Sequence, residues 1–341
     1  MGLSGNGAVS ILKPIQNALL MEEKELNARS NAPYHYKLIF EDNQWTPRGS
    51  VMATQRMISL NNVDALITLA DYAMGPIVHI TRDKKIANLG YAWGVDKADG
   101  QYNFIFGDSE LGYAQAFYSA VKNSPLKTGI LSVRQSATPR FVDELQRLAK
   151  ADGKSEFPIT FINTESVDFR TVILRLNKED HLEQLIMMLY GDDLNKFMYQ
   201  MEQSDFRPAF VMMGNDIEGS QINRKILLAR GTVVASCSLL DDVFPKAYKA
   251  YTHEDSTTYA GFGYDTLKLI SESIESAPPS KLPMRERIAE ALAAKKTFLG
   301  VSGSYTQKNG VFDTFPKLYR LTATGEEPFV PPTPPPAPSK N

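Results

Sequence analysis

Short apolar runs of strand length alternate along the chain with segments that carry apolar residues at helical spacing. The runs 65–70 and 184–190 are almost continuously apolar, which is typical of strands buried on both faces of a parallel sheet. Between such runs, Phe141, Leu145 and Leu148 recur at intervals that place them on one face of a helix. This alternation predicts βαβ units, in which helices cover both faces of parallel sheets.

The same pattern locates the individual strands and the helical stretches. The predicted strands are 36–40, 65–70, 85–90, 103–106, 128–133, 157–162, 184–190, 209–213 and 232–236. Helical patterns dominate from 244 to 296, interrupted at 277–280, and strand-like runs return at 298–305 and 317–322. The sequence therefore predicts an α/β protein.

Composition limits the size and the partners of this protein. Its 341 residues, 43% of them apolar, are enough for about two lobes with substantial cores. The 37 basic and 39 acidic residues nearly cancel, which argues against nucleic acid as a partner because nucleic acid calls for a concentrated basic surface. No stretch reaches the roughly 18–20 consecutive apolar residues of a membrane span. The single cysteine, Cys237, cannot form an internal disulfide.

The two ends of the chain differ in character. The start has no basic segment followed by an apolar one, so an export signal is either absent or already removed. The prolines of 331–338 predict an extended, solvated polyproline II conformation, and we expect 329–341 to be a disordered tail.

The sequence offers no catalytic constellation. Ser124 and Lys127 have the spacing of a serine–lysine pair, but Pro125 between them would disrupt the helical turn that such a pair needs. The four histidines lack the spacing of a metal site. Residues 96–100 resemble half a calcium loop and are better explained as a polar turn. We predict no catalytic residue, no metal and no cofactor.

Two acidic clusters follow apolar strands. Residues 190–193 come after one predicted strand, and residues 214–218 come after another. In an open parallel sheet the carboxyl ends of the strands form the ligand crevice. Aspartates at these places either cap the helices that follow or bind a cationic or zwitterionic ligand.

Several segments, in order, resemble one known family. Leu3-Ser4-Gly5, then Ala18 and Asn27, resembles the opening of the solute-binding proteins of ABC transporters for branched-chain amino acids. The matching segments are 3–28, 36–47, 55–67, 167–170, 259–265 and 298–303. Each motif is weak by itself, and their order carries most of the weight.

The resemblance implies an α/β fold of two Rossmann-like lobes, the type I periplasmic-binding-protein clamshell, joined by a three-crossover hinge. The implied first lobe is 1–108 with 241–308, and the second is 109–240 with 309–328. We place the crossings near 107–110, 238–241 and 307–311.

The resemblance also implies a function. A non-enzymatic, extracytoplasmic solute-binding protein of this family captures a small polar ligand, an amino acid or a related molecule, between its lobes and delivers it to an ABC transporter permease. The expected location is periplasmic, with a signal peptide that is not present in this chain. A ligand-sensing receptor of the same fold that acts in signalling is the alternative. A doubly wound α/β enzyme is a third class, for which the sequence shows no nucleophile–base pair.

Positions carried over from the family predict the ligand-binding residues. Those of the first lobe are Ser10, Tyr72, Ala73, Gly90, Tyr91 and Trp93. Those of the second lobe are Gln135, Ser136, Tyr190, Asp192 and Asp216. In amino-acid binders of this family an acid of the second lobe holds the ligand ammonium, and Asp216 stands at that position.

The chain departs from the family at three places. Aromatic residues and Asp71 replace small hydroxyl residues at the strand ends, and Asp71 would repel a carboxylate if it faced inward. Tyr91 and Trp93 therefore either contact a ligand or pack in the hinge or crevice. Residues 134–139 replace an acidic Tyr-Gly turn. A first strand ahead of Leu3 is missing, which would leave part of a parallel sheet unpaired.

Overall fold

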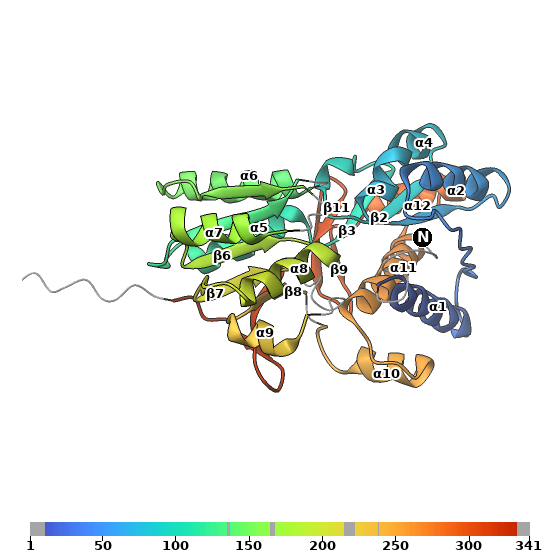
Figure 1. Ribbon diagram of the computed structural model, residues 1–341. Helices are drawn as coiled ribbons and strands as arrows, with labels where there is room; N and C mark the ends of the chain where they lie inside the picture. The colour runs from blue at the N-terminus through green and yellow to red at the C-terminus, as the bar shows by residue number, and fades with distance from the viewer. Residues whose placement is uncertain (1–10, 135–136, 164–167, 215–221, 238, 333–341) are drawn as a thin grey trace, which may run out of the picture. The chain divides into compact units, whose positions relative to one another are not determined.

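The computed structural model describes residues 11–134, 137–163, 168–214, 222–237 and 239–332. The chain forms two compact units (Figure 1). Unit 1 comprises Met1–Ser109 and Cys237–Thr314, and unit 2 comprises Glu110–Ser236 and Phe315–Asn341. The chain thus passes from one unit to the other three times. Each unit holds a mixed sheet with helices, which confirms the predicted α/β class.

Unit 1 is built from two separate stretches of the sequence. Its first part contains α1 (Lys13–Ala28), α2 (Pro47–Ser59), β1 (Ala65–Leu69), α3 (Asp71–Met74), η2 (Gly75–Ile77), α4 (Val78–Asp83), β2 (Ala87–Tyr91), η3 (Val95–Lys97) and β3 (Asn103–Gly107). Its second part contains α10 (Val243–Thr252), α11 (Thr258–Ser276), α12 (Met284–Ala294), β9 (Thr297–Leu299), β10 (Ser304–Lys308) and β11 (Val311–Asp313). The strand order is β1-β2-β3-β11-β10-β9, and β10 runs antiparallel to both of its neighbours.

Helices cover both faces of this sheet. Leu89 and Phe104 pack in one core with Phe262 of α11. Leu66 packs in a separate core with Ile58 of α2, and the neighbouring Ile67 contacts the α11 side. Since adjacent strand residues point to opposite faces, α11 and α2 lie on opposite sides of the sheet.

The predicted strand at 36–40 is wrong. The segment pairs with no described strand, and α1 supplies partners to its main chain. Tyr36 N donates to Asn27 Oδ1 at 2.8 Å, and Leu38 N donates to Glu23 Oε1 at 2.7 Å. Among the described strands, β1 therefore lies at one edge of the sheet of unit 1.

A tight hairpin gives the end of unit 1 its antiparallel strands. Lys308 pairs with Val311 across a two-residue turn in which Asn309 has φ 53° and Gly310 has φ 84°. Asn-Gly with two positive φ angles is the favoured hairpin turn. The segment 307–311, where the sequence placed the third crossing, is therefore this hairpin, and unit 1 continues to Thr314.

Unit 2 carries a seven-stranded sheet in the order β13-β12-β8-β7-β6-β4-β5. Its elements are α5 (Glu110–Val121), β4 (Thr128–Val133), α6 (Thr138–Ala151), β5 (Ile159–Ile162), α7 (Arg170–Leu174), the π-helix η4 (Arg175–Glu179), β6 (Gln184–Met188), α8 (Gly191–Glu202), β7 (Phe210–Met213), α9 (Arg224–Ala229), β8 (Val233–Ser236), β12 (Lys317–Leu321) and β13 (Glu326–Pro328). The strands from β4 to β8 run parallel, and β12 and β13 add antiparallel strands at one edge. Of the predicted tail at 329–341, the part from 333 on lies outside the described residues.

Candidate functional site

The carboxyl ends of β1 and β2 bring the described candidate residues of unit 1 together. The two strands pair in parallel up to Leu69 and Tyr91. Ala70 N then donates to Tyr91 O at 2.7 Å, and Ala70 turns the chain with φ 72°. Tyr72 and Ala73 follow in α3. They and Tyr91 therefore lie at the edge of the unit 1 sheet that is formed by the carboxyl ends of its parallel strands.

Asp71, at this edge, is neutralised by a lysine. Its Oδ1 accepts from Gly94 N at 2.9 Å and lies 2.9 Å from Lys97 Nζ. Both side chains are only 16% exposed. Burial by itself would lower the pKa of Lys97, but the carboxylates of Asp71 and Asp96 outweigh it and raise that pKa. The repulsion expected of an unpaired Asp71 is thus offset by a charge that the sequence analysis did not identify.

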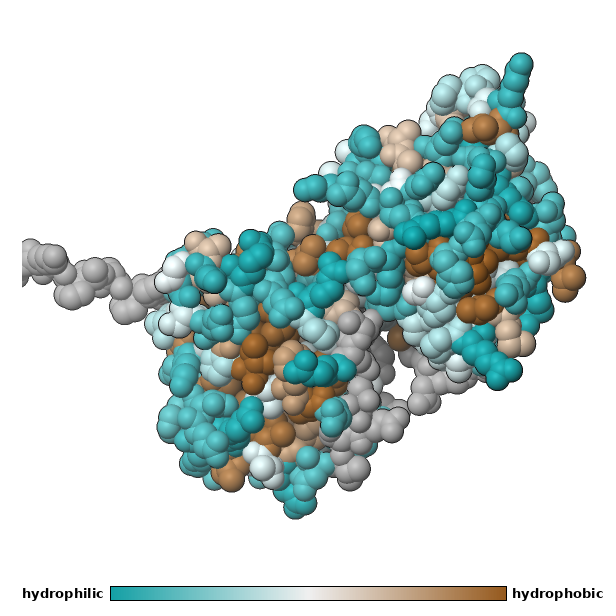
Figure 2. Space-filling model, turned by 90° about the horizontal axis from the view of Figure 1, so that it is seen from above, coloured by the Kyte–Doolittle hydropathy of each residue, from teal (hydrophilic) through white to brown (hydrophobic). Residues whose placement is uncertain are grey.

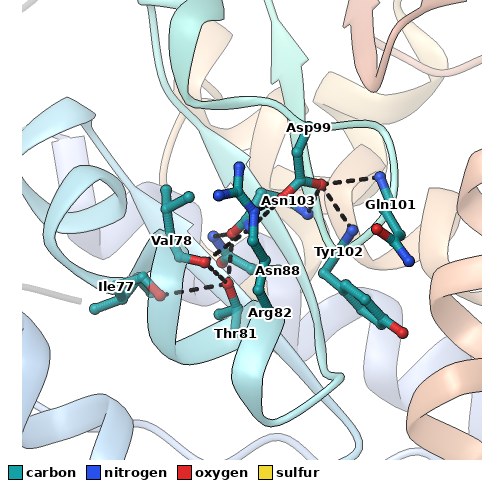
Figure 3. A network of polar contacts seen from close by, with 9 residues as sticks. All are labelled: Ile77, Val78, Thr81, Arg82, Asn88, Asp99, Gln101, Tyr102 and Asn103. Carbon is teal, nitrogen blue, oxygen red and sulfur yellow. Dashed lines mark hydrogen bonds and ion pairs between the residues drawn. The ribbon is translucent and has the colours of Figure 1, made fainter.

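A polar network fixes the loop that supplies Lys97 (Figure 3). Asp99 accepts from the main-chain N–H groups of Gln101 at 2.9 Å and of Tyr102 and Asn103 at 2.8 Å, and Arg82 Nε donates to it at 2.8 Å. Burial opposes ionisation of Asp99, but these hydrogen bonds hold its pKa at about 2. This carboxylate therefore closes the turn predicted at 96–100.

Trp45, which is not among the predicted ligand-binding residues, packs beside Tyr72. The two ring centroids are 5.0 Å apart at 36°. Trp45 has φ 55°, which is uncommon for a bulky residue. Its main-chain N–H donates to Asn43 Oδ1 at 3.2 Å. Its buried Nε1 has no hydrogen-bond partner among the described residues.

Tyr91 packs against two aromatic side chains of α11. Its ring lies 4.7 Å from that of Phe262 at 30°, and 6.4 Å from that of Tyr259 at 84°. Its hydroxyl lies 3.4 Å from Asp108 Oδ1. These contacts favour the packing interpretation for Tyr91. Trp93, two residues further on, is half-buried.

Gly90 and Ala73 are buried, so they can offer a ligand little beyond main-chain groups. A Cβ at Gly90 would lie 2.5 Å from Met74 Sδ. Close packing against α3 therefore accounts for a glycine at this position.

Hydrogen bonds join the segments of unit 1 that precede two of the three crossings, those after Ser109 and after Thr314. Ser109 N and Ser109 Oγ donate to the two carboxylate oxygens of Asp313 at 3.0 and 2.5 Å. Thr314 N donates to Gly107 O at 3.2 Å. Burial raises the pKa of Asp313. At the third passage, burial raises the pKa of the Cys237 thiol well above its usual value.

In unit 2 the described candidates follow β6. Tyr190 precedes α8 and packs against the core, whereas Asp192 lies exposed in the first turn of that helix. Neither Asp192 nor Asp193 is the N-cap residue, which is Tyr190. Carboxylates in a first helical turn are favoured by the helix dipole, and Asp192 remains accessible.

β4 and β7 flank β6, and the remaining candidates of unit 2 follow these two strands in the sequence. Gln135, Ser136 and Asp216 lie outside the described residues, as does Ser10 of unit 1. Their roles in binding remain predictions.

Among the described residues, no group of three or more His, Cys, Asp or Glu side chains could hold a metal ion. In the same part of the chain, no helix has the length and apolarity to cross a membrane.

Comparison with known proteins gives one family match and many similar structures. A family model described as periplasmic binding protein matches residues 2–324. No curated protein matches the chain.

The similar structures include a periplasmic binding protein type 1 from Bordetella pertussis, with a TM-score of 0.78 and 16% identity over 96% of this chain and 98% of that one. The leucine-binding protein LivK from Thermotoga maritima has a TM-score of 0.76 and 14% identity, with 96% of each chain covered. The branched-chain amino acid transporter substrate-binding protein LivJ from Streptococcus pneumoniae, in complex with isoleucine, has a TM-score of 0.74 and 16% identity over 94% of this chain and 93% of that one. At such identities the likeness shows a shared fold.

Proposed function

Because the chain belongs to the periplasmic binding protein family, a family of binding proteins rather than enzymes, we propose that it captures an amino acid or a related small polar molecule between its two units. On this proposal it acts in the periplasm and delivers the ligand to the permease of an ABC transporter. The structure of LivJ in complex with isoleucine and the leucine-binding protein LivK support the choice of ligand class.

One observation carries the proposal. Every described candidate residue lies at or just after the carboxyl end of a parallel strand: β1 for Tyr72, β2 for Trp93 and β6 for Asp192. This edge is where open α/β sheets bind ligands. A ligand that contacts both units does so fully only in a closed form, so binding would shift the population toward closure.

The proposed roles of the residues follow from their charge and polarity. On this proposal, Asp216 and Asp192 are the acids that hold a ligand ammonium group. Because Lys97 compensates the charge of Asp71, the Asp71 carboxylate should not repel the carboxylate of the ligand. The rings of Tyr72 and Trp45 offer an apolar wall.

Calorimetric titration with the common amino acids and small carboxylates tests the proposal. We expect saturable binding of at least one compound, accompanied by a higher melting temperature, because a ligand at 100 times its Kd stabilises the native state by about 2.7 kcal/mol. No binding across the panel, with an unchanged melting temperature, would count against the proposal.

Two variants locate the site. Asp216→Asn should weaken binding of an amino acid at least tenfold, since it removes the charge that holds the ammonium group. Asp205→Asn, an exposed aspartate after α8, is the matched control and should leave the affinity unchanged. Equal affinities for these two variants would refute the role of Asp216.

A further inference from the structure

Asp71 and Lys97 are charged side chains that are largely removed from water. In the space-filling view, by contrast, polar residues cover most of the surface and apolar residues are exposed between them (Figure 2). Scattered exposed apolar residues are ordinary on a protein surface, whereas a largely buried charge calls for an explanation. The segment that this pair holds provides one.

The segment 92–99, which we call the Trp93 loop, leads from β2 toward β3. It contains the short helix η3 and Trp93, a predicted ligand contact. Near its two ends, Ala92 and Ala98 pack in one small core with Met74 of α3. That core includes none of the residues between Ala92 and Ala98. The apolar contacts of this core therefore fix the ends of the loop and not its middle.

Asp71, the first residue of α3, holds the middle of the Trp93 loop. Its Oδ1 accepts from Gly94 N at 2.9 Å, and Lys97 Nζ lies 2.9 Å from the same oxygen. Lys97 Nζ also lies 3.0 Å from Asp96 Oδ1, which belongs to the loop itself. One carboxylate oxygen of α3 thus joins two points of the loop, and the first of them directly follows Trp93.

The glycine at position 94 fits this arrangement. Gly94 has φ −82° and ψ 109°, which lie in the region open to all residues, so the backbone does not require a glycine here. A Cβ at this position would lie 2.6 Å from Lys97 Nζ and 2.9 Å from Oδ1 of both Asp71 and Asp96. The close approach of these three charged groups therefore accounts for the glycine.

Asp99 fixes the far end of the loop independently of Asp71 (Figure 3). Its carboxylate accepts from Arg82 Nε and from the main-chain N–H groups of residues 101–103. The turn that follows the Trp93 loop can thus keep its shape when Asp71 is replaced. Loss of the Asp71 carboxylate should release the part of the loop around Trp93 and leave the connection to β3 in place.

We propose that Asp71 is a positioning residue: through Gly94 and Lys97 it holds the Trp93 loop on α3 and so places Trp93 for the ligand. This inference rests on the function proposed above, in which Trp93 is a predicted ligand contact. It gives Asp71 a role that requires no contact with the ligand, because both donors to its Oδ1 come from the Trp93 loop. A side chain that is already ordered loses less conformational entropy when a ligand binds, so the hold on the loop favours binding.

Quenching of Trp93 fluorescence by acrylamide, measured on the ligand-free protein, tests the positioning. Every protein compared carries Trp45→Phe, so that Trp93 is its single tryptophan. Asp71→Ala removes the acceptor of Gly94 N, and the quenching constant of Trp93 should rise about twofold or more, because the loop opens locally. Asp71→Asn keeps an acceptor for Gly94 N and should show less quenching than Asp71→Ala.

Two further variants support the comparison. Asp255→Ala breaks an exposed ion pair with Lys249 in the same unit and should leave the quenching unchanged. Gly94→Ala crowds the charged groups while Asp71 stays in place, and it should raise the quenching even where Asp71→Ala does not fold. Quenching in Asp71→Ala or Gly94→Ala no stronger than in Asp255→Ala would overturn the proposal. So would equal quenching in Asp71→Asn and Asp71→Ala.

The affinity of the same variants separates this inference from the proposed function. The probe is the compound of the calorimetric panel that the Trp45→Phe protein binds most tightly. Asp71→Ala should weaken its binding about fivefold, which corresponds to the cost of ordering one large side chain, and Asp255→Ala should leave it unchanged. Raised quenching with unchanged affinity would overturn the role of Asp71 in binding. Raised quenching in a protein that binds no compound of the panel would refute the proposed function, and would support the hold of Asp71 on the loop.

Discussion

The ion pair of Asp71 and Lys97 should stabilise unit 1 measurably, because both groups are largely removed from water and lie at the predicted ligand edge. The perturbation is a double-mutant cycle of Asp71→Asn, Lys97→Met and the combined variant. Asp71→Asn keeps an acceptor for Gly94 N and removes only the charge. Lys97→Met keeps an unbranched apolar chain of similar length.

The expected coupling follows from the geometry. At 2.9 Å between Nζ and Oδ1, the attraction is about 1.4 kcal/mol at the dielectric constant of water and about 6 kcal/mol at an effective value near 20. The 16% exposure of each side chain places the pair between exposed and fully buried pairs, so we expect about 2 kcal/mol of coupling.

Tryptophan fluorescence during urea unfolding measures this coupling in the correct unit. The chain has two tryptophans, Trp45 and Trp93, and both belong to unit 1. Lys13 and Glu254, an exposed pair of the same unit with a 2.6 Å separation, form the control cycle and should couple more weakly. Coupling of Asp71 to Lys97 no larger than in that control would refute the reasoning that burial makes this pair strong.

Two further predictions concern buried groups of unit 1. Burial raises the pKa of Asp265 to about 6 despite hydrogen bonds from Val301 and Ser302. The native state therefore keeps a proton that the unfolded chain loses, and the free energy of unfolding should fall, by up to about 3 kcal/mol, as the pH rises from about 4 to about 6. Asp265→Asn should flatten that slope in urea titrations across this range, and an unaltered slope would assign it to other groups. In the Asn309-Gly310 turn, Gly310→Ala should cost about 2 kcal/mol or more, because φ is +84° and a Cβ would lie 2.6 Å from Gly100 Cα. Gly325→Ala, where a Cβ meets nothing within 4 Å, is the control, and equal midpoints for the two variants would contradict the argument.

Burial periodicity explains why most of the fold could be predicted. The continuous apolar run 184–190 contains β6, an interior strand of the sheet in unit 2, because a strand covered on both faces needs no polar residue. The segment 36–40 has the same apolar character and failed as a strand prediction, since pairing depends on a neighbour that no local pattern reveals. The Asn309-Gly310 hairpin, in contrast, had a local signal that the sequence analysis overlooked.

The candidate residues come from the resemblance to the family, and their roles in binding remain predictions. Topology explains only why those near β1 and β2, and separately those after β6, lie at the carboxyl ends of parallel strands of their own sheets. Contacts between residues that are distant in the sequence could not be predicted. Ser109 and Asp313 are 204 positions apart, and nothing near either residue in the sequence indicates their contact. Trp45 likewise lies in a turn before α2, far along the chain from Tyr72.

Ligand capture is the central claim, and a titration monitored by tryptophan emission tests it most directly. Trp93 is a predicted ligand contact and Trp45 packs beside Tyr72, so the correct amino acid should change the emission saturably, with the stoichiometry and Kd found by calorimetry. Mass spectrometry of the denatured protein identifies any ligand that copurifies and would mask the titration. A saturable change with at least one small polar compound is the predicted result. An unchanged emission across the whole panel, with no small molecule released on denaturation, would contradict the account.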